Sequence, residues 1–538
     1  MMLIEVRRRI VELGFTPSAL TPCSLSPFCP SAPAKGLRCL AGSSPCSDFP
    51  PFCPSALPPF PFALYLCPMP KGPKKERKTF SYVDIIDTAD EGLAIGRCED
   101  GRIIQVKGAV PGDIADTVAL EKRKGMFITL ATHFHKLSSD RAEPFCSHFG
   151  TCGGCKWQHM QYEAQLRYKA KKVRDAFQRI GGLDPNLVQP IVGAPFQQYY
   201  RNKLEFTASD KRWLTIEEMQ SPDILAKDGL GFHLPGAFDK VLDIQHCYLQ
   251  GDPSNDIRLH IREVAVGHGW PFYNIKGRTG YLRNIIVRNT QAGDTMVVLV
   301  VGEDEPGRLA LLTQSLVERF PKIVSVYGCV NTKANDTIND LPLQLLHGQE
   351  TLIETLHHVR FHIGPKSFFQ TNSVQAANLY ALAKELADLK PDENVYDLYC
   401  GVGSLGIYMA DRCRRVTGIE IIAEAVADAA KNAALNQLTN THFETGHVEL
   451  LLDPAFIQRY GRPDVVITDP PRAGMHPDVI KHLLAAAPQR IVYVSCNPAT
   501  QARDISMLSP DYKVVTAIPV DMFPHTHHIE SVALLVRS

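Results

Sequence analysis

A cysteine and a glutamate near the C-terminal end are the residues best suited to covalent chemistry. Cys496 follows Val-Tyr-Val-Ser, a run that predicts a short buried strand, and Asn-Pro ends that strand at once. Open α/β sheets bind ligands at the carboxyl ends of their strands, where a thiol can act as a nucleophile. Glu530 begins the last strand-like run and can approach Cys496 if the closing strands lie beside it. An inert buried cysteine is the alternative for Cys496 taken alone.

This pair fits methylation at carbon 5 of uracil. Carbon 5 is too weak a nucleophile to take a methyl group directly, but a thiolate adding to carbon 6 makes it an enolate carbon that can attack a methyl sulfonium. A base must then remove the carbon 5 proton so that the thiolate can leave. Cys496 would make the attack and Glu530 would abstract the proton.

The turn from Asp397 to Ser404, DLYCGVGS, follows a strand-like run and opens a helix. Gly401 lets a ligand approach the backbone, and Glu420 closes the next strand, where a carboxylate can take two ribose hydroxyls. With Gly406 the turn completes G-x-G-x-x-G, so a dinucleotide is the alternative ligand. Asp397 argues against a dinucleotide because its carboxylate repels a pyrophosphate and suits a cation such as S-adenosylmethionine.

Two further motifs lie near this turn. Asp469 in DPPR ends the third long strand-like run, where its carboxylate can hydrogen-bond a flat heterocycle. Gln370 in FFQTN offers an amide just before the sheet begins.

Three cysteines with C-x5-C-x2-C spacing predict a metal centre. They are Cys146, Cys152 and Cys155, with two glycines between the last two, and the best later candidate for a fourth ligand is Cys247. Four thiolates fit zinc or a [4Fe–4S] cluster, and the long gap and remote fourth ligand favour the cluster. A disulfide is not expected in a cytosolic chain.

The elements that must position these residues fall into three regions. Residues 75–136 carry five short alternating runs separated by glycine turns, which predict an OB-like barrel. Residues 137–362 predict a mixed α+β region. Residues 363–538 alternate strands with helices, including 423–438, which predicts a parallel, doubly wound, Rossmann-like sheet.

The predicted helix from Gln161 to Ile180 is rich in basic residues. They are Arg167, Lys169, Lys171, Lys172 and Arg174. Such a surface can meet phosphates, and a merely solvated face is the alternative.

The amino-acid composition limits the classes of binding partner that we expect. The 538 residues have zero formal net charge and 21% charged residues, so nucleic-acid binding must come from local patches. No apolar run reaches the roughly 18 residues that span a bilayer, so we expect no membrane partner. Residues 1–68, rich in Pro, Ser and Cys, predict a disordered tail, or a spurious extension before a start at Met69.

Together these motifs resemble the bacterial ribosomal RNA uracil-5-methyltransferases in their iron–sulfur-containing branch, from about Met69 to Ser538. Four features match in order: a TRAM-like barrel, the cysteine site, the DLYCGVGS and DPPR motifs, and SCNPAT with HIES. Residues 1–68 have no counterpart, and Ser404 stands where the family has Asn.

The resemblance implies a cytoplasmic, monomeric enzyme that methylates a uridine of 23S ribosomal RNA. It implies a [4Fe–4S] cluster on the four cysteines and a covalent adduct with the flipped base. The residues that it places around S-adenosylmethionine and the target base are Gln370, Tyr399, Gly401, Ser404, Glu420 and Asp469. The alternatives are methylation of the transfer RNA T-loop and a non-catalytic RNA-binding assembly factor.

Overall fold

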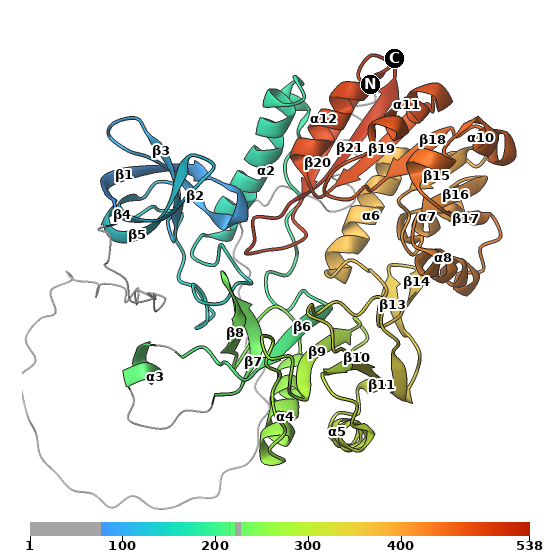
Figure 1. Cartoon of the computed structure of the whole chain (residues 1–538). Coiled ribbons are helices and arrows are strands. Elements are labelled where there is room, and N and C mark those ends of the chain that lie inside the picture. The colour runs from blue at the N-terminus through green and yellow to red at the C-terminus, as the bar shows by residue number, and fades with distance from the viewer. Residues whose placement is uncertain (1–76, 215, 221–226) are drawn as a thin grey trace, which may run out of the picture.

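The computed structural model describes residues 77–214, 216–220 and 227–538, which form three packed parts (Figure 1). The segment 1–68, for which the sequence predicts disorder or a spurious extension, lies outside the described residues. None of the helices in the described ranges is long and apolar enough to cross a membrane.

The first part is the predicted five-stranded barrel, which is confirmed. Its strands are β1 (Thr79–Thr88), β2 (Ala94–Arg97), β3 (Ile103–Lys107), β4 (Ile114–Arg123) and β5 (Met126–Lys136). They close in the order β1-β2-β3-β5-β4, with β3 and β5 parallel. Alternate apolar residues such as Val83, Ile104 and Val106 fill the interior, as expected for a small barrel of this kind.

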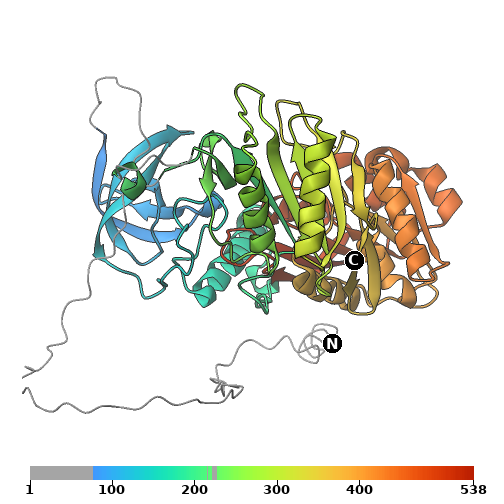
Figure 2. The ribbon, with the colours of Figure 1, turned by 90° about the horizontal axis from the view of Figure 1, so that it is seen from below.

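The second part is a seven-stranded sheet in the order β12-β11-β10-β9-β6-β7-β8. Its strands are β6 (Lys203–Ser209), β7 (Gly229–Leu234), β8 (Ala237–Asp243), β9 (Leu282–Asn289), β10 (Thr295–Val301), β11 (Ile323–Val330) and β12 (Gln344–Gly348). Figure 2 shows α4 (Ser254–Gly267) and α5 (Pro306–Arg319) side by side over one face of this sheet. Their apolar residues pack into a shared core with the strands. The short α3 (Ile216–Gln220) lies between β6 and β7 in the chain.

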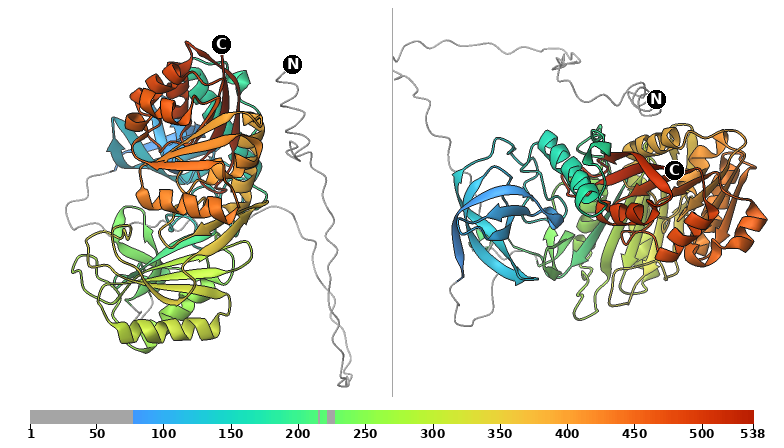
Figure 3. Two further views of the ribbon diagram at one scale, coloured as in Figure 1. Left: turned by 90° about the vertical axis from the view of Figure 1, so that its right-hand side faces the viewer. Right: turned by 90° about the horizontal axis from the view of Figure 1, so that it is seen from above.

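The third part lies above the second in the left view of Figure 3 and is the predicted doubly wound sheet. Its strand order is β17-β16-β15-β18-β19-β21-β20, with the first five strands parallel and the last two antiparallel. The strands are β15 (Asn394–Leu398), β16 (Arg415–Glu420), β17 (Thr441–Thr445), β18 (Val465–Thr468), β19 (Arg490–Ser495), β20 (Tyr512–Val520) and β21 (Glu530–Arg537).

Helices and a hairpin cover both faces of this sheet. The helices are α6 (Ser373–Ala387), α7 (Ser404–Met409), α8 (Ala423–Leu435), α9 (Val448–Leu451), α10 (Pro454–Tyr460), α11 (Pro477–Ala486) and α12 (Pro498–Leu508), and the hairpin is β13 (Leu352–Leu356) with β14 (Val359–Ile363). One face packs on α6, α7, α8 and the hairpin, and the other on α9 to α12. Short 3-10 turns lie at Asp90–Gly92, Pro185–Leu187 and Ala410–Arg412.

Helix α2 (Tyr162–Arg179) joins the barrel to the third part. Its apolar residues Val173 and Phe177 pack into the core of the doubly wound sheet beside α12. Trp157, just before the helix, donates its indole N–H to the carbonyl of Gly92 in the barrel at 3.3 Å.

Part of the basic surface predicted for α2 is engaged in contacts within the protein. Lys171 forms an ion pair with Asp87 and Lys172 forms one with Asp90, both at 2.6 Å to the barrel. Lys169 is fully buried. These cations therefore serve contacts within the protein, because acidic partners distant in sequence fold against the helix.

Candidate active site

The glycine turn after β15 is shaped by backbone that few side chains tolerate. Tyr399, Gly401 and Gly403 have φ values of 62°, 55° and 76°, in the left-handed region that favours glycine. A Cβ on Gly406 would lie 2.8 Å from the Asp397 carboxylate. Because Gly406 has none, its N–H donates to that carboxylate at 2.8 Å, which fixes the start of α7 against the end of β15.

This turn opens onto a cavity of about 1220 Å³. The cavity is lined by all six predicted cofactor residues, Gln370, Tyr399, Gly401, Ser404, Glu420 and Asp469, together with Asp397. The structure therefore brings together residues that span 100 positions of the sequence.

Three carboxylates meet at this cavity. Burial raises the pKa of Asp397 to about 7, with the charges of Asp469 and Glu420 adding to the rise and the Gly406 N–H opposing it. Burial alone raises the pKa of Asp469 to about 7. Among the described residues, no cation lowers the pKa of Asp397 or Asp469. A positively charged ligand therefore fits here, and the sulfonium of S-adenosylmethionine supplies an activated methyl group when bound.

Glu420 binds the turn directly. Its two carboxylate oxygens accept the N–H groups of Gly401 and Ile422, each at 3.0 Å. This holds the carboxylate at the cavity wall, where it could take ribose hydroxyls. Ser404 stands where the family has Asn. Its hydroxyl accepts a hydrogen bond from the hydroxyl of Tyr380 at 3.0 Å.

Cys496 and Glu530 lie next to Asp469, beside the residues that line the cavity. β19 ends at Ser495, and β21 begins at Glu530 and pairs antiparallel with β19, so the two strand ends meet. Burial raises the pKa of the Cys496 thiol to about 11, with Glu530 and Asp469 adding to the rise and Arg472 opposing it. The pKa of Glu530 is raised well above its usual value by burial, and the charge of Asp469 adds to the rise.

Arg472 is a candidate site residue that the sequence did not indicate. It closes the DPPR motif, and its guanidinium is the cation that stabilises a thiolate at Cys496. Its carbonyl accepts hydrogen bonds from the Asn497 amide at 2.9 Å and the Thr500 hydroxyl at 3.3 Å. The DPPR and SCNPAT loops are thereby joined. The sequence shows this arginine at the end of DPPR, but it does not show that the arginine lies beside Cys496.

The four predicted ligand cysteines line a second cavity, of about 150 Å³. Burial raises the pKa of Cys152 to about 11 and that of Cys155 to about 12. The pKa values of Cys146 and Cys247 are also raised by burial. Lys156 and Arg258 place positive charge near these thiols, which suits an anionic cluster of thiolates. In the described ranges, no three His, Cys, Asp or Glu side chains are arranged to hold a metal ion as they stand.

The parallel sheet, its glycine turn and its acidic cavity define an α/β enzyme that uses S-adenosylmethionine. A family model described as tRNA (Uracil-5-)-methyltransferase matches residues 344–538. The chain belongs to the RNA uracil-5-methyltransferase family and is an S-adenosylmethionine-dependent RNA methyltransferase.

Similar proteins span nearly the whole described chain. An uncharacterized RNA methyltransferase of Bacteroides thetaiotaomicron is 48% identical over 451 residues, covering 83% of this chain and 99% of the relative. One of Porphyromonas gingivalis is 48% identical over 466 residues, covering 85% and 100%. The solved structure of the Pyrococcus abyssi tRNA (uracil-54, C5)-methyltransferase with S-adenosyl-L-homocysteine is 30% identical, with a TM-score of 0.65, and covers 84% of this chain and 100% of its own.

The position of Glu420 predicts a loss of cofactor affinity on substitution. Glu420→Ala is expected to weaken S-adenosylmethionine binding by about 10- to 100-fold, because hydrogen bonds to a charged group contribute about 1.5–3 kcal/mol each. Isothermal titration calorimetry measures the change. Glu424→Ala removes an exposed carboxylate from the same cavity and should change the affinity by less than about threefold. Equal losses in both variants would contradict a specific contact at Glu420.

Proposed function

We propose that this enzyme methylates carbon 5 of a uridine in 23S ribosomal RNA through a covalent bond between Cys496 and carbon 6. The observation that carries the proposal is the meeting of Cys496, Glu530 and Arg472 beside the acidic cavity. A thiol, a buried carboxyl and a cation are the groups that this reaction requires.

Each of the three groups has a defined task. The Cys496 thiolate adds to carbon 6, and Arg472 stabilises the negative charge before the attack. Carbon 5 then takes the methyl group, and S-adenosylhomocysteine leaves. Glu530 accepts the proton from carbon 5, the double bond re-forms, and the thiolate is expelled. The proton thus ends on Glu530 and the cysteine is regenerated.

The raised pKa of Cys496 predicts a rate that increases with pH. A thiol with a pKa of about 11 is mostly protonated at neutral pH, so the thiolate fraction rises about tenfold per pH unit. The single-turnover rate should therefore climb between pH 7 and pH 9. Arg472→Gln should lower the rate at every pH because it removes the cation that favours the thiolate. A rate that is constant over this range would contradict the assignment.

Ribosomal RNA is the proposed substrate because the cysteine site resembles that of the iron–sulfur branch of the family. Transfer RNA is the second candidate. It is favoured by the Pyrococcus abyssi enzyme, whose name specifies uracil 54 of tRNA and which matches 84% of this chain. A match of that length reaches into the barrel, so the barrel does not discriminate between the two substrates.

The deciding experiment offers labelled S-adenosylmethionine with unmodified large-subunit ribosomal RNA or unmodified transfer RNA. Label on ribosomal RNA alone supports the proposal, and label on transfer RNA alone keeps the chemistry and replaces the substrate. If neither RNA is labelled although both bind, both proposed substrates are contradicted. The enzyme is proposed to act as a monomer in the cytoplasm, which light scattering and cell fractionation test.

A [4Fe–4S] cluster on Cys146, Cys152, Cys155 and Cys247 is part of the proposal. The support is a set of four thiols that surround one cavity, with nearby cations to balance a cluster of thiolates. The four side chains border one space of about 150 Å³, and the long gap between the first two cysteines and the remote fourth ligand favour a cluster over a single zinc ion. We expect the cluster to have a structural or RNA-positioning role.

Ligand removal tests the cluster. Cys152→Ser and Cys247→Ser, purified without oxygen, should lose the visible absorbance and the iron that the unmodified protein carries. Cys329→Ser alters a buried cysteine of β11 outside the site and should keep both. Stoichiometric zinc with no iron in the unmodified protein would overturn the cluster assignment. If methylation rates differ between oxidised and reduced protein, the structural role is wrong.

A further inference from the structure

Glu530 is held at the end of a nine-residue connection between two paired strands. Val520 and Glu530 are opposite each other in the β20–β21 ladder. Residues 521–529, here called the 521–529 loop, therefore leave and rejoin the sheet at the level of Glu530. The position of the Glu530 carboxyl depends on the conformation of this loop.

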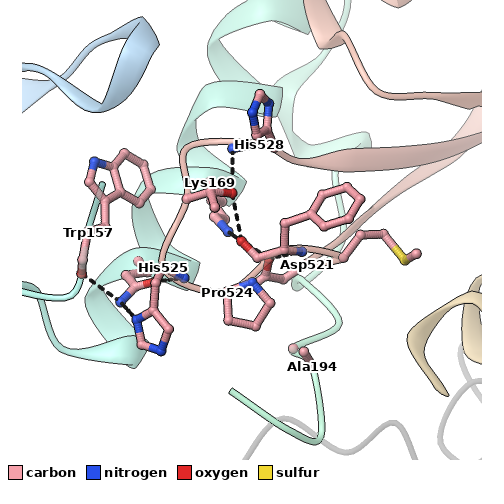
Figure 4. Close-up of polar contacts among 12 residues, drawn as sticks. Trp157, Lys169, Ala194, Asp521, Pro524, His525 and His528 are labelled. Carbon is pink, nitrogen blue, oxygen red and sulfur yellow. Dashed lines mark hydrogen bonds and ion pairs between the residues drawn. The ribbon is translucent and has the colours of Figure 1, made fainter. Parts of the chain in front are cut away.

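A buried ion pair fixes the beginning of the loop. Lys169 of α2 donates from Nζ to Asp521 Oδ1 at 2.6 Å and to the carbonyl of Phe523 at 3.0 Å (Figure 4). Both charged side chains are 0% exposed. Tyr162, about two turns earlier on α2, donates to Asp521 Oδ2 at 2.9 Å and accepts the N–H of Ala194 at 2.7 Å. Both oxygens of the carboxylate are thus occupied.

A second set of contacts fixes the middle of the loop. Gln165 accepts the N–H of His525 at 2.9 Å and contacts the ring Nδ1 at 3.2 Å. The His525 carbonyl accepts the N–H groups of Lys156 and Trp157 at 2.8 and 3.0 Å. Tyr200 donates its hydroxyl to the carbonyl of Pro524 at 3.0 Å.

These polar contacts occupy only one part of the buried face of α2. Tyr162, Gln165 and Lys169 follow the i, i+3, i+7 spacing of one helix face and all meet the 521–529 loop. Further along, Val173 and Phe177 make that face apolar where it meets the sheet. The polar residues of this helix face are therefore those that contact the 521–529 loop, and the residues of the face that contact the sheet are apolar.

A requirement for stability does not explain a buried lysine here. Desolvating two charges costs about as much as their attraction returns, and apolar replacements of similar volume are often as stable. A buried pair does, however, restrict the geometry of the groups that it joins. Here the groups joined are α2 and the loop that carries the proposed base.

We infer that Lys169 and Asp521 are positioning residues that hold the 521–529 loop so that Glu530 reaches the carbon 5 proton. The inference rests on the proposed covalent reaction. It gives Lys169 no contact with RNA or cofactor. Its effect falls chiefly on the proton-removal step, because Cys496 follows β19 and is not part of the loop, while Arg472 meets the loop at the ring of His528, at 3.4 Å.

The test is Lys169→Met in the full chain, with RNA and S-adenosylmethionine. The variant should form the methylated RNA–protein adduct at the normal rate and resolve it about 10- to 100-fold more slowly, since a misplaced catalytic group loses rate on this scale. The adduct should accumulate on a denaturing gel. The turnover number and the Michaelis constants for RNA and cofactor should fall together, so that kcat/KM stays unchanged.

Two comparisons separate this inference from the reaction on which it rests. Lys171→Met, two residues further along the helix and paired with the barrel, should resolve its adduct normally. Glu530→Gln should accumulate adduct; if it does not, the proposed reaction fails. If Glu530→Gln accumulates adduct and Lys169→Met does not, the positioning role fails.

A double variant covers the case in which a single unpaired charge prevents folding. Lys169→Met with Asp521→Leu replaces the ion pair by apolar groups and should fold. It should accumulate adduct as well, because the loop is no longer fixed. Normal resolution by this variant, whatever its melting temperature, would overturn the inference.

Discussion

Cys496→Ala is expected to abolish methyl transfer, with a loss on the order of 10⁴-fold or more. Without the thiol, carbon 5 of uracil never becomes nucleophilic, so the remaining residues cannot compensate. RNA and cofactor binding should change little, because the cofactor cavity is formed by other side chains. Transfer of labelled methyl groups under single-turnover conditions measures the loss.

The matched control is Cys329→Ala, which removes a buried thiol from the central sheet. It should retain the rate of the unmodified enzyme. If Cys496→Ala transferred methyl groups within about tenfold of that rate, Cys496 would not be the nucleophile and a direct mechanism would be required.

Glu530→Gln is expected to stall the enzyme after methyl transfer. Loss of a positioned base costs about 10²- to 10⁴-fold in turnover, and the methylated RNA should remain bonded to Cys496. Formation of the adduct should not slow, because the charge of Glu530 raises the pKa of that thiol and its removal favours the thiolate. Cys496→Ala thus prevents formation of the covalent intermediate, whereas Glu530→Gln prevents its breakdown.

A denaturing gel with labelled RNA detects the trapped adduct. The double variant Cys496→Ala with Glu530→Gln should show none, which identifies the bond as one to Cys496. Rapid turnover by Glu530→Gln without an adduct would assign proton removal to another group.

The sequence predicted the sheet of the third part well because its strands are continuous apolar runs. Motif residues lie at the C-terminal ends of four of these strands, which are β15, β16, β18 and β19. β17 was not predicted, since THFET is short, polar and not fully buried at this edge of the sheet. Helix α8 was expected to reach Leu438 but ends at Leu435, because the left-handed Gln437, with a φ of 58°, turns the chain.

The sequence could not predict what the charges of α2 do. Lys169 looks like its neighbours along the chain, and its partner Asp521 is 352 positions away. Only folding shows that one lysine is buried while Lys171 and Lys172 reach the barrel. The candidate site was more predictable because glycine, carboxylate and cysteine motifs each mark a strand end, and strand ends of a parallel sheet converge.

Every cysteine in the described part of the chain has its pKa raised by burial. At pH 7 a thiol with the pKa of Cys496, about 11, is ionised in only about one molecule in 10⁴. Peroxide and alkylating agents attack thiolates, so the Cys496 thiol of the resting enzyme resists both. Between substrates, Cys496 therefore remains a protonated and weakly reactive thiol. Inhibitors directed at Cys496 will need to resemble the RNA base more than a general thiol reagent.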